Sequence, residues 1–260
     1  MTSTVRKSQI QGKGDEMNTQ TPIRLKIEDA AIGFDQESPL LECVDLEIRA
    51  GEIVGLTGRS GIGKTTLLRT AAGLVSPLSG SVECCCTADA RAKKGAIGLI
   101  PQRLGLVQHQ TVGYNVLMGA LAGANFLQTA LSLPSKKMRE ETRSVIEEVG
   151  LADKTLESVN RLSGGQQRRV AIARAMLQEP ELLLADECLG ELDAETARGI
   201  IDLFRHMADE HNMAILIVDH NPVRAKTFCD RVYQLRGRRL IPFEEDAQPS
   251  LLPIIEEASS

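Results

Sequence analysis

The chain has 260 residues, enough for one large domain or for a domain that carries a subdomain. Its 42% hydrophobic and 25% charged residues are typical of a soluble globular protein. Aromatic residues make up only 3% and the net charge is −5, which argues against a base-stacking platform and against a nucleic-acid partner.

The beginning of the chain is polar and then becomes strand-like. Residues 1–22 lack the apolar segment of a signal peptide, and we expect a disordered arm there. Apolar and polar residues then alternate over 23–27 and 41–48, as they do in half-buried strands. The turn-rich residues 33–39 separate these two predicted strands.

A glycine-rich segment fits the pattern G-x-x-x-x-G-K-[ST] at every fixed position. It consists of Gly58, Arg59, Ser60, Gly61, Ile62, Gly63, Lys64 and Thr65. A short apolar strand over 52–56 precedes it and a helix over 66–73 follows it, which is the context that a phosphate-binding loop requires. The alternative, a glycine-rich turn that binds nothing, is disfavoured by this context.

The loop predicts a site for the phosphates of a nucleotide. Its glycines let backbone N–H groups turn toward a phosphate chain, and the helix that Thr66 opens adds a positive dipole. Lys64 would supply a positive charge to the β- and γ-phosphates, and the Thr65 hydroxyl is suited to Mg²⁺.

Strands and helices alternate through the rest of the chain. We predict strands at 80–87, 96–100, 182–185, 214–218 and 231–235, and helices at 136–149, 167–178, 194–210 and 222–229. This alternation is typical of an α/β fold with a parallel sheet, which binds ligands at the carboxyl ends of its strands. Residues 242–260, which contain three prolines, are expected to form a loose tail.

Residues 104–135 contain no Asp, Glu, Lys or Arg, and such a lack of charged residues is also typical of a membrane span. However, His109, Asn115 and Gln128 interrupt the apolar residues. Helices of a subdomain, with an uncharged face turned toward a partner, fit this segment better than a membrane span.

Three adjacent cysteines, Cys84, Cys85 and Cys86, are the most unusual feature of the composition. None of the six cysteines forms a C-x-x-C pair, so the spacing of zinc ligands is absent. We expect reduced thiols, with a metal or redox role as the alternative.

Two acidic residues follow the apolar run 182–185, at the point where a buried strand would end. Asp186 is placed to hold Mg²⁺ beside the phosphate loop. Its neighbour Glu187 is suited to polarise a water molecule that attacks the γ-phosphate. Two exposed acids with no role are the alternative, which the nearby phosphate loop disfavours.

Leu162, Ser163, Gly164, Gly165 and Gln166 match the signature pentapeptide of the ATP-binding cassette (ABC) ATPases, and the chain resembles that family from about residue 23 to 240. The resemblance implies one ATPase domain over 23–241, with a P-loop core and a mainly parallel sheet. It also implies an N-terminal antiparallel β subdomain and an α-helical signature subdomain at about 103–170. ATP is the implied substrate and Mg²⁺ the implied cofactor.

Further positions match motifs of the family. Gln102 matches the glutamine that contacts Mg²⁺ and water and senses the transport partner, and His220 matches the histidine that touches the γ-phosphate. Asp193 matches the aspartate of the D-loop, and Phe34 stands where the family has an aromatic residue that stacks on adenine. The resemblance therefore implies catalytic roles for Glu187, His220 and Gln102, and metal binding by Thr65, Gln102 and Asp186.

The signature implies a second subunit. In the family, this segment closes on the ATP that the phosphate loop of another subunit holds, and we expect a homodimer because the chain has one set of motifs. Two departures concern the contact between subunits: Cys188 replaces the usual proline, and Gly190-Glu191 replaces the usual Ser-Ala of the D-loop.

Residues 115–123 and 129–134 resemble a stretch of the phosphonate-importer ATPases. This implies a subunit on the cytoplasmic face of a membrane that powers import of a phosphonate or related oxyanion. Its implied partners are an integral membrane permease and a periplasmic or extracellular substrate-binding protein. Two alternatives stay open: an exporter or lipoprotein-release ATPase, and a soluble cassette that serves carbon–phosphorus lyase or remodels a macromolecular complex.

Overall fold

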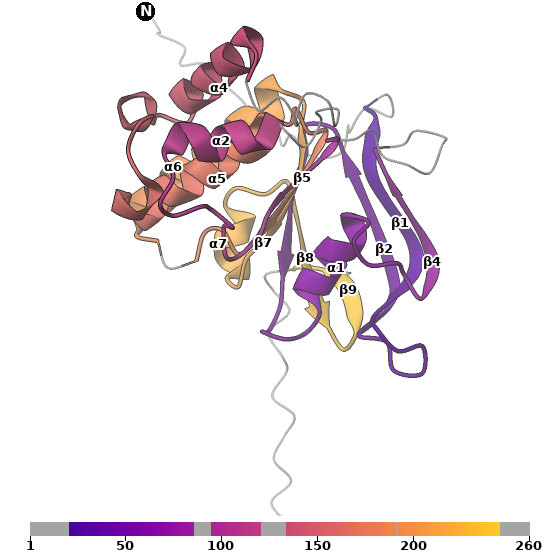
Figure 1. The fold of residues 1–260 in the computed structure, drawn as a ribbon. Helices are drawn as coiled ribbons and strands as arrows, with labels where there is room; N and C mark the ends of the chain where they lie inside the picture. The colour runs from indigo at the N-terminus through magenta and orange to yellow at the C-terminus, as the bar shows by residue number, and fades with distance from the viewer. Residues whose placement is uncertain (1–20, 86–94, 121–133, 191, 245–260) are drawn as a thin grey trace, which may run out of the picture.

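Two β-sheets organise the computed structural model, which describes residues 21–85, 95–120, 134–190 and 192–244 (Figure 1). The larger sheet has the strand order β5-β6-β7-β3-β8-β9. Its strands are β3 (Ile53–Thr57), β5 (Ile97–Ile100), β6 (Leu182–Asp186), β7 (Ala214–Val218), β8 (Arg231–Arg236) and β9 (Arg239–Pro242). All neighbours pair in parallel except β9, which is antiparallel to β8. The expected α/β fold with a mainly parallel sheet is confirmed.

The smaller sheet is antiparallel and has the order β2-β1-β4. Its strands are β1 (Ile23–Ile32), β2 (Leu41–Arg49) and β4 (Ser79–Cys84). The helices are α1 (Lys64–Ala71), α2 (Val112–Ala120), α4 (Lys136–Glu148), α5 (Gly164–Met176), α6 (Ala194–Glu210) and α7 (Pro222–Lys226). Helix α1 contacts both sheets, so the smaller sheet is held to the larger one through the helix that follows the glycine-rich loop.

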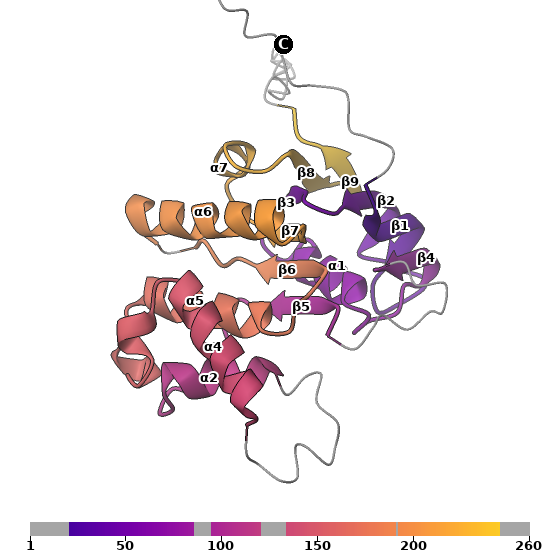
Figure 2. The same ribbon diagram turned by 90° about the horizontal axis from the view of Figure 1, so that it is seen from above.

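The parallel sheet carries an apolar core on each face. In β6, Leu183 and Ala185 belong to the core beneath α5 and α6, whereas Leu182 and Leu184 belong to the core shared with β1, β2 and α1. Figure 2 shows the sheet between these two layers. Both faces of the central strands are therefore covered, which explains why their sequences are unbroken apolar runs rather than alternating ones.

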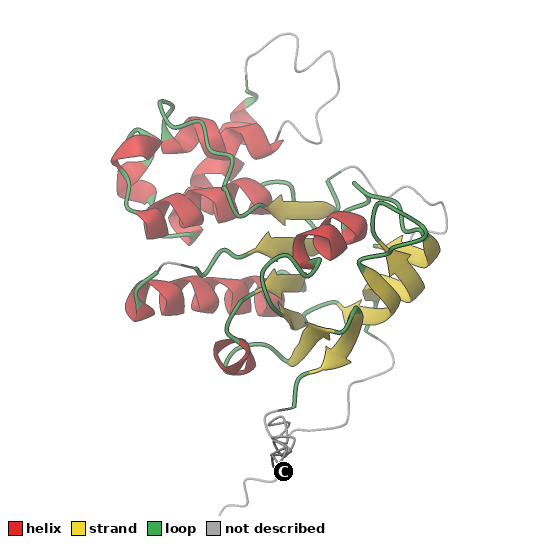
Figure 3. Ribbon diagram, turned by 90° about the horizontal axis from the view of Figure 1, so that it is seen from below, coloured by secondary structure: helices red, strands yellow, loops and turns green. Residues whose placement is uncertain are grey.

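Helices α2, α4 and α5 pack against one another on one side of the sheet (Figure 3). Asn115, which is 1% exposed, fixes the loop that leads into α2. Its amide accepts from Val107 N and donates to the carbonyls of Val107 and Thr111. Within the described ranges, no helix is long and apolar enough to cross a membrane.

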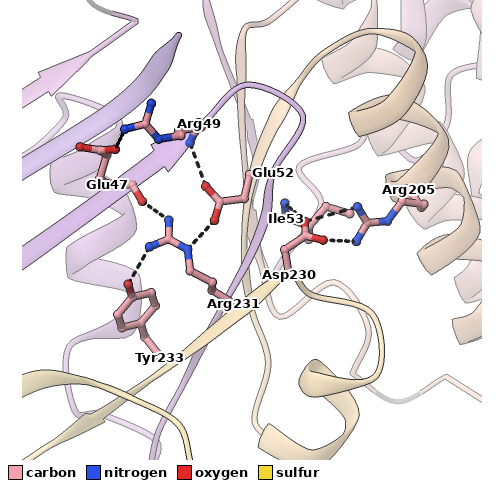
Figure 4. Close-up of polar contacts among 8 residues, drawn as sticks. All are labelled: Glu47, Arg49, Glu52, Ile53, Arg205, Asp230, Arg231 and Tyr233. Atoms are coloured by element: carbon pink, nitrogen blue, oxygen red, sulfur yellow. Dashed lines mark hydrogen bonds and ion pairs between the residues drawn. The ribbon is translucent and has the colours of Figure 1, made fainter. Parts of the chain in front are cut away.

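Polar contacts join the two sheets near the start of β3 (Figure 4). The Glu52 carboxylate is 4% exposed, and it accepts from Arg49 N and from the Arg231 guanidinium. The same guanidinium donates to the carbonyl of Glu47 and, over 2.9 Å, to the hydroxyl of Tyr233. Arg231 of β8 is thereby bonded to β2 and to the turn before β3.

The element boundaries differ from the predicted ones at several points. Helix α5 begins at Gly164 rather than 167, because the Ser163 hydroxyl and the Gln166 side chain form a capping box. Helix α7 ends at Lys226, before the expected 229, and β9 was not predicted, its last residue Pro242 being the first of the expected tail. The arm at 1–20, the tail from 245, residues 121–133 and Cys86 lie outside the described residues.

Candidate functional site

The glycine-rich loop joins β3 to α1, and the Lys64 side chain lies over it. Lys64 is 4% exposed, and its ammonium donates to the carbonyls of Gly58 (2.9 Å) and Arg59 (3.0 Å). Gly63 precedes the helix at φ 115°, a left-handed conformation that residues with a Cβ rarely adopt. The loop therefore curls around a lysine ammonium at the N-terminus of a helix, which is an arrangement suited to phosphate.

Thr65 and Asp186 form an oxygen-rich pair beside this loop. The Thr65 hydroxyl donates to Asp186 Oδ2 over 2.9 Å, and Asp186 is 6% exposed at the end of β6. Its second oxygen, Oδ1, is buried and has no hydrogen-bond partner among the described residues. A hydroxyl beside a carboxylate with an unpaired buried oxygen is the kind of ligand set that Mg²⁺ prefers, so these residues fit that ion.

Glu187 stands at the centre of a group of polar side chains. Its carboxylate accepts from Gln102 Nε2 over 2.7 Å, and it lies 3.4 Å from His220 Nδ1 and 3.9 Å from Lys64 Nζ. The Glu187 side chain is 13% exposed, and its backbone is left-handed, with φ 53°. A non-glycine residue in this conformation is uncommon and is often found at functional sites.

The sheet topology explains this convergence. Lys64, Gln102, Glu187 and His220 each follow the carboxyl end of a different strand, namely β3, β5, β6 and β7. These four strands are parallel neighbours, so their carboxyl ends lie along one edge of the sheet. The structure thus brings together the candidate catalytic and metal-binding residues that lie far apart in the sequence.

An ion pair between a buried carboxylate and a partly exposed arginine supports the turn that carries His220. Asp219 is 1% exposed, and its two carboxylate oxygens accept from Arg224 Nη2 over 2.8 Å and Nε over 2.9 Å. The N–H of Asn221 also donates to this carboxylate. Sequence reasoning missed Asp219 and Arg224, although an acid buried at a strand end would have been a signal.

The signature segment lies at the start of α5 and packs against the start of α6. A Cβ on Gly165 would lie 2.3 Å from Thr196 Cγ2, so only a glycine fits there without movement. Asp193 caps α6, and its hydrogen bonds from the Thr196 side chain and N–H lower the pKa of its carboxyl. Among the described residues, no hydrogen bond or ion pair joins Leu162–Gln166 to the glycine-rich loop of the same chain.

Two other residues stand apart from the cluster. Phe34 is 74% exposed in the loop between β1 and β2, and the structure does not bring it to the group around Glu187. Cys188 is buried in the core beneath α5 and α6, where burial raises the pKa of its thiol to about 12. The residue that replaces the family's proline therefore serves as apolar packing.

A buried strand, a glycine loop closed by Lys64 and Thr65, and a carboxylate pair at the end of β6, which β7 separates from β3, together define a P-loop nucleotide-binding protein. The family model described as ABC transporter matches residues 41–190. The chain belongs to this family, and it is an ATPase of the ABC type.

Known proteins resemble the chain over most of its length. "Phosphonates import ATP-binding protein PhnC 2" of Synechococcus sp. (strain JA-2-3B'a(2-13)) is 37% identical over 219 residues, covering 82% of this chain and 81% of that protein. The PhnC protein of Escherichia coli (strain UTI89 / UPEC) is 34% identical, covering 82% and 85%. The structure of cbiO1 from Clostridium perfringens, described as part of the ABC transporter complex cbiONQ, has a TM-score of 0.74 at 26% identity and covers 84% and 87%.

Proposed function

We propose that the chain is the ATPase subunit that drives import of a phosphonate or a related oxyanion through a membrane permease. The convergence of Gln102, His220 and Lys64 on the Glu187 carboxylate is the observation that supports hydrolysis. The import of phosphonates is supported by relatives that carry this name and align with more than four-fifths of the chain.

In the proposed mechanism, the chain's own residues bind the phosphates of ATP, orient the attacking water and accept its proton. The N–H groups of the loop and the Lys64 ammonium would hold the phosphates of ATP, and Glu187 would accept a proton from the attacking water. Gln102 and His220 would orient that water and the γ-phosphate. Mg²⁺, held by Thr65, Asp186 and Gln102, would supply neutralising charge at the phosphates.

The proposed active assembly contains two copies of the chain. Ser163 caps α5, so the N–H groups of Gly164 and Gly165 lie in the first turn of the helix, where four such groups have no partner within the helix. An anion bound by a second copy would satisfy these groups. In this arrangement each ATP lies between the glycine loop of one copy and the signature of the other.

We further propose that the permease docks beside α2 on the cytoplasmic face of the membrane. Tyr114 and Met118, one helical turn apart on α2, are 42% and 40% exposed, and Val107 in the preceding loop is 48% exposed. An exposed group of large apolar side chains is typical of a protein interface. A substrate-binding protein outside the membrane would deliver the oxyanion to the permease.

Reconstitution of the chain with its permease in proteoliposomes tests the proposal. We expect ATP hydrolysis to increase when a binding protein loaded with methylphosphonate is present on the opposite side, and uptake of the phosphonate to follow. Glu187→Gln should abolish both while ATP is still bound, because the amide cannot accept the proton. If ATP hydrolysis increases with another solute but not with phosphonate, the proposed substrate is wrong. If Glu187→Gln hydrolyses ATP at an undiminished rate, the assignment of Glu187 as the general base is wrong.

A further inference from the structure

Three side chains that ATP hydrolysis does not use meet at the ends of two helices. Glu148 is the last residue of α4, His206 lies near the end of α6, and His211 directly follows α6. Glu148 Oε1 lies 3.4 Å from His206 Nε2 and 2.8 Å from His211 Nε2. One carboxylate oxygen thus contacts two imidazole nitrogens.

This group is remote from the nucleotide site. The cavity beside it is lined by residues 179–181, which lead into β6, and by residues 211–213, which lead into β7. It therefore borders the amino ends of these strands, whereas Glu187 and His220 follow their carboxyl ends. The two sites lie at opposite edges of the sheet.

We propose that Glu148, His206 and His211 bind a divalent transition-metal ion of the Zn²⁺ class. Two imidazoles and one carboxylate are a common ligand set for Zn²⁺, and imidazole nitrogen favours Zn²⁺, Co²⁺ and Ni²⁺ over Mg²⁺ and Ca²⁺. Three protein ligands leave a fourth position for water or for a small external ligand.

The positions of the three groups are close to what such an ion requires. Their ligand atoms all lie within 4.8 Å of one another. Around a tetrahedral Zn²⁺ with bonds of about 2.0–2.1 Å, ligand atoms are about 3.3–3.4 Å apart. The two histidine rings are perpendicular rather than stacked, and both side chains are nearly half exposed, so small rotations complete the geometry.

The surroundings favour a cation. Glu148 and His211 line a cavity of about 430 Å³, which also contains Glu141, Glu179 and Glu181. Arg24 is the one arginine or lysine among the lining residues, and it is paired with Glu181. The excess of carboxylates attracts a divalent ion, and the cavity provides its path from solvent.

A bound ion would join two layers of the fold. Helix α4 packs on α2 and α5, whereas α6 packs on strands β3 and β7 of the parallel sheet. An ion held by Glu148 on one side and by two histidines on the other would tie these parts together. Because the unfolded chain lacks this arrangement, the ion should stabilise the folded state.

Metal titration of the full chain, freed of metal by a chelator and kept free of nucleotide, tests the proposal. We expect calorimetry to show one Zn²⁺ per chain and a higher melting temperature with Zn²⁺. Co²⁺ should give visible absorption bands without the intense near-ultraviolet band of a thiolate ligand. His206→Ala and His211→Ala should each weaken binding about tenfold or more, since each removes one of three ligands.

His109→Ala is the matched control, because His109 is an exposed histidine outside the group. This variant should bind Zn²⁺ as the wild-type chain does, and His206→Ala without added Zn²⁺ should hydrolyse Mg·ATP at the wild-type rate. Equal metal binding by the wild-type chain and the two histidine variants would overturn the proposal, as would a thiolate band with Co²⁺. Failure of phosphonate transport would leave these binding results unchanged, so the two proposals are tested separately.

Discussion

Gln102 donates a 2.7 Å hydrogen bond to the carboxylate of Glu187, although 85 positions separate the two residues in the chain. Gln102 follows β5, next to the loop that leads to α2, and Glu187 follows β6. A residue at the start of the segment that leads to the proposed permease surface is therefore bonded directly to the proposed general base. Movement of the loop would alter the position of this carboxylate.

Gln102→Ala should lower ATP turnover about tenfold while ATP binding is kept. The substitution removes one hydrogen bond to the charged carboxylate, and such bonds contribute about 1.5–3 kcal/mol, the lower end of which corresponds to roughly tenfold in rate. Steady-state ATPase assays and equilibrium nucleotide binding check this prediction. Glu187→Gln serves as the comparison, with a loss of about 100-fold or more expected. Equal losses in the two variants would show that Gln102 does more than orient Glu187.

Gly165→Ala should destabilise the protein by about 1–3 kcal/mol, the usual result of overpacking. The added methyl group would meet Thr196 Cγ2 at 2.3 Å. The double variant Gly165→Ala/Thr196→Ser removes that methyl and keeps the hydroxyl that donates to Asp193 Oδ2. We expect denaturant unfolding to show recovery in the double variant. If Thr196→Ser does not restore stability, the contact between the two helix starts is not the cause.

The Cys188 thiol should make the protein less stable in alkaline solution. Burial raises the pKa of this thiol from 9.0 to about 12. Between these values the unfolded chain loses the proton and the folded chain retains it, so the free energy of unfolding falls as the pH rises above 9. Chemical unfolding between pH 8 and pH 11 should give a shallower decline for Cys188→Ala than for the wild-type chain. Identical slopes would contradict the assignment.

Glu52→Gln should lower the free energy of unfolding by about 2 kcal/mol. Glu52 is 4% exposed, but the Arg231 side chain is 34% exposed, so the loss should be smaller than for a fully buried ion pair. Glu28→Gln is the control, because the Lys26–Glu28 pair is exposed and screened by solvent, so its loss should change the free energy of unfolding much less. Urea unfolding of both variants checks the prediction. Similar losses in the two variants would refute it.

Local signals in the sequence were sufficient for much of the fold. The apolar run 182–185 and the glycine loop predict β6, β3 and α1, because each depends on neighbours in the chain. Strand β9 escaped prediction because it is only four residues long and pairs with β8 through a tight turn. Helix α5 began earlier than its hydrophobic pattern indicates because its first turn is set by a cap.

Contacts between distant residues were not accessible in the same way. The signature, Gln102 and His220 were found through resemblance to a family, which conveys their positions but not their distances from Glu187. The grouping of Glu148 with His206 and His211 depends on how separate elements pack. A single exposed histidine carries no pattern, so only the folded chain reveals this group.

The left-handed backbone of Glu187 has a consequence for protein engineering. A conformation of this kind costs on the order of 1–3 kcal/mol for a residue with a Cβ. Glycine would adopt it freely, but it would bring no carboxylate. A laboratory selection for thermal stability alone would therefore favour glycine at position 187 and enrich variants that are stable but inactive. A useful selection must demand turnover at every round.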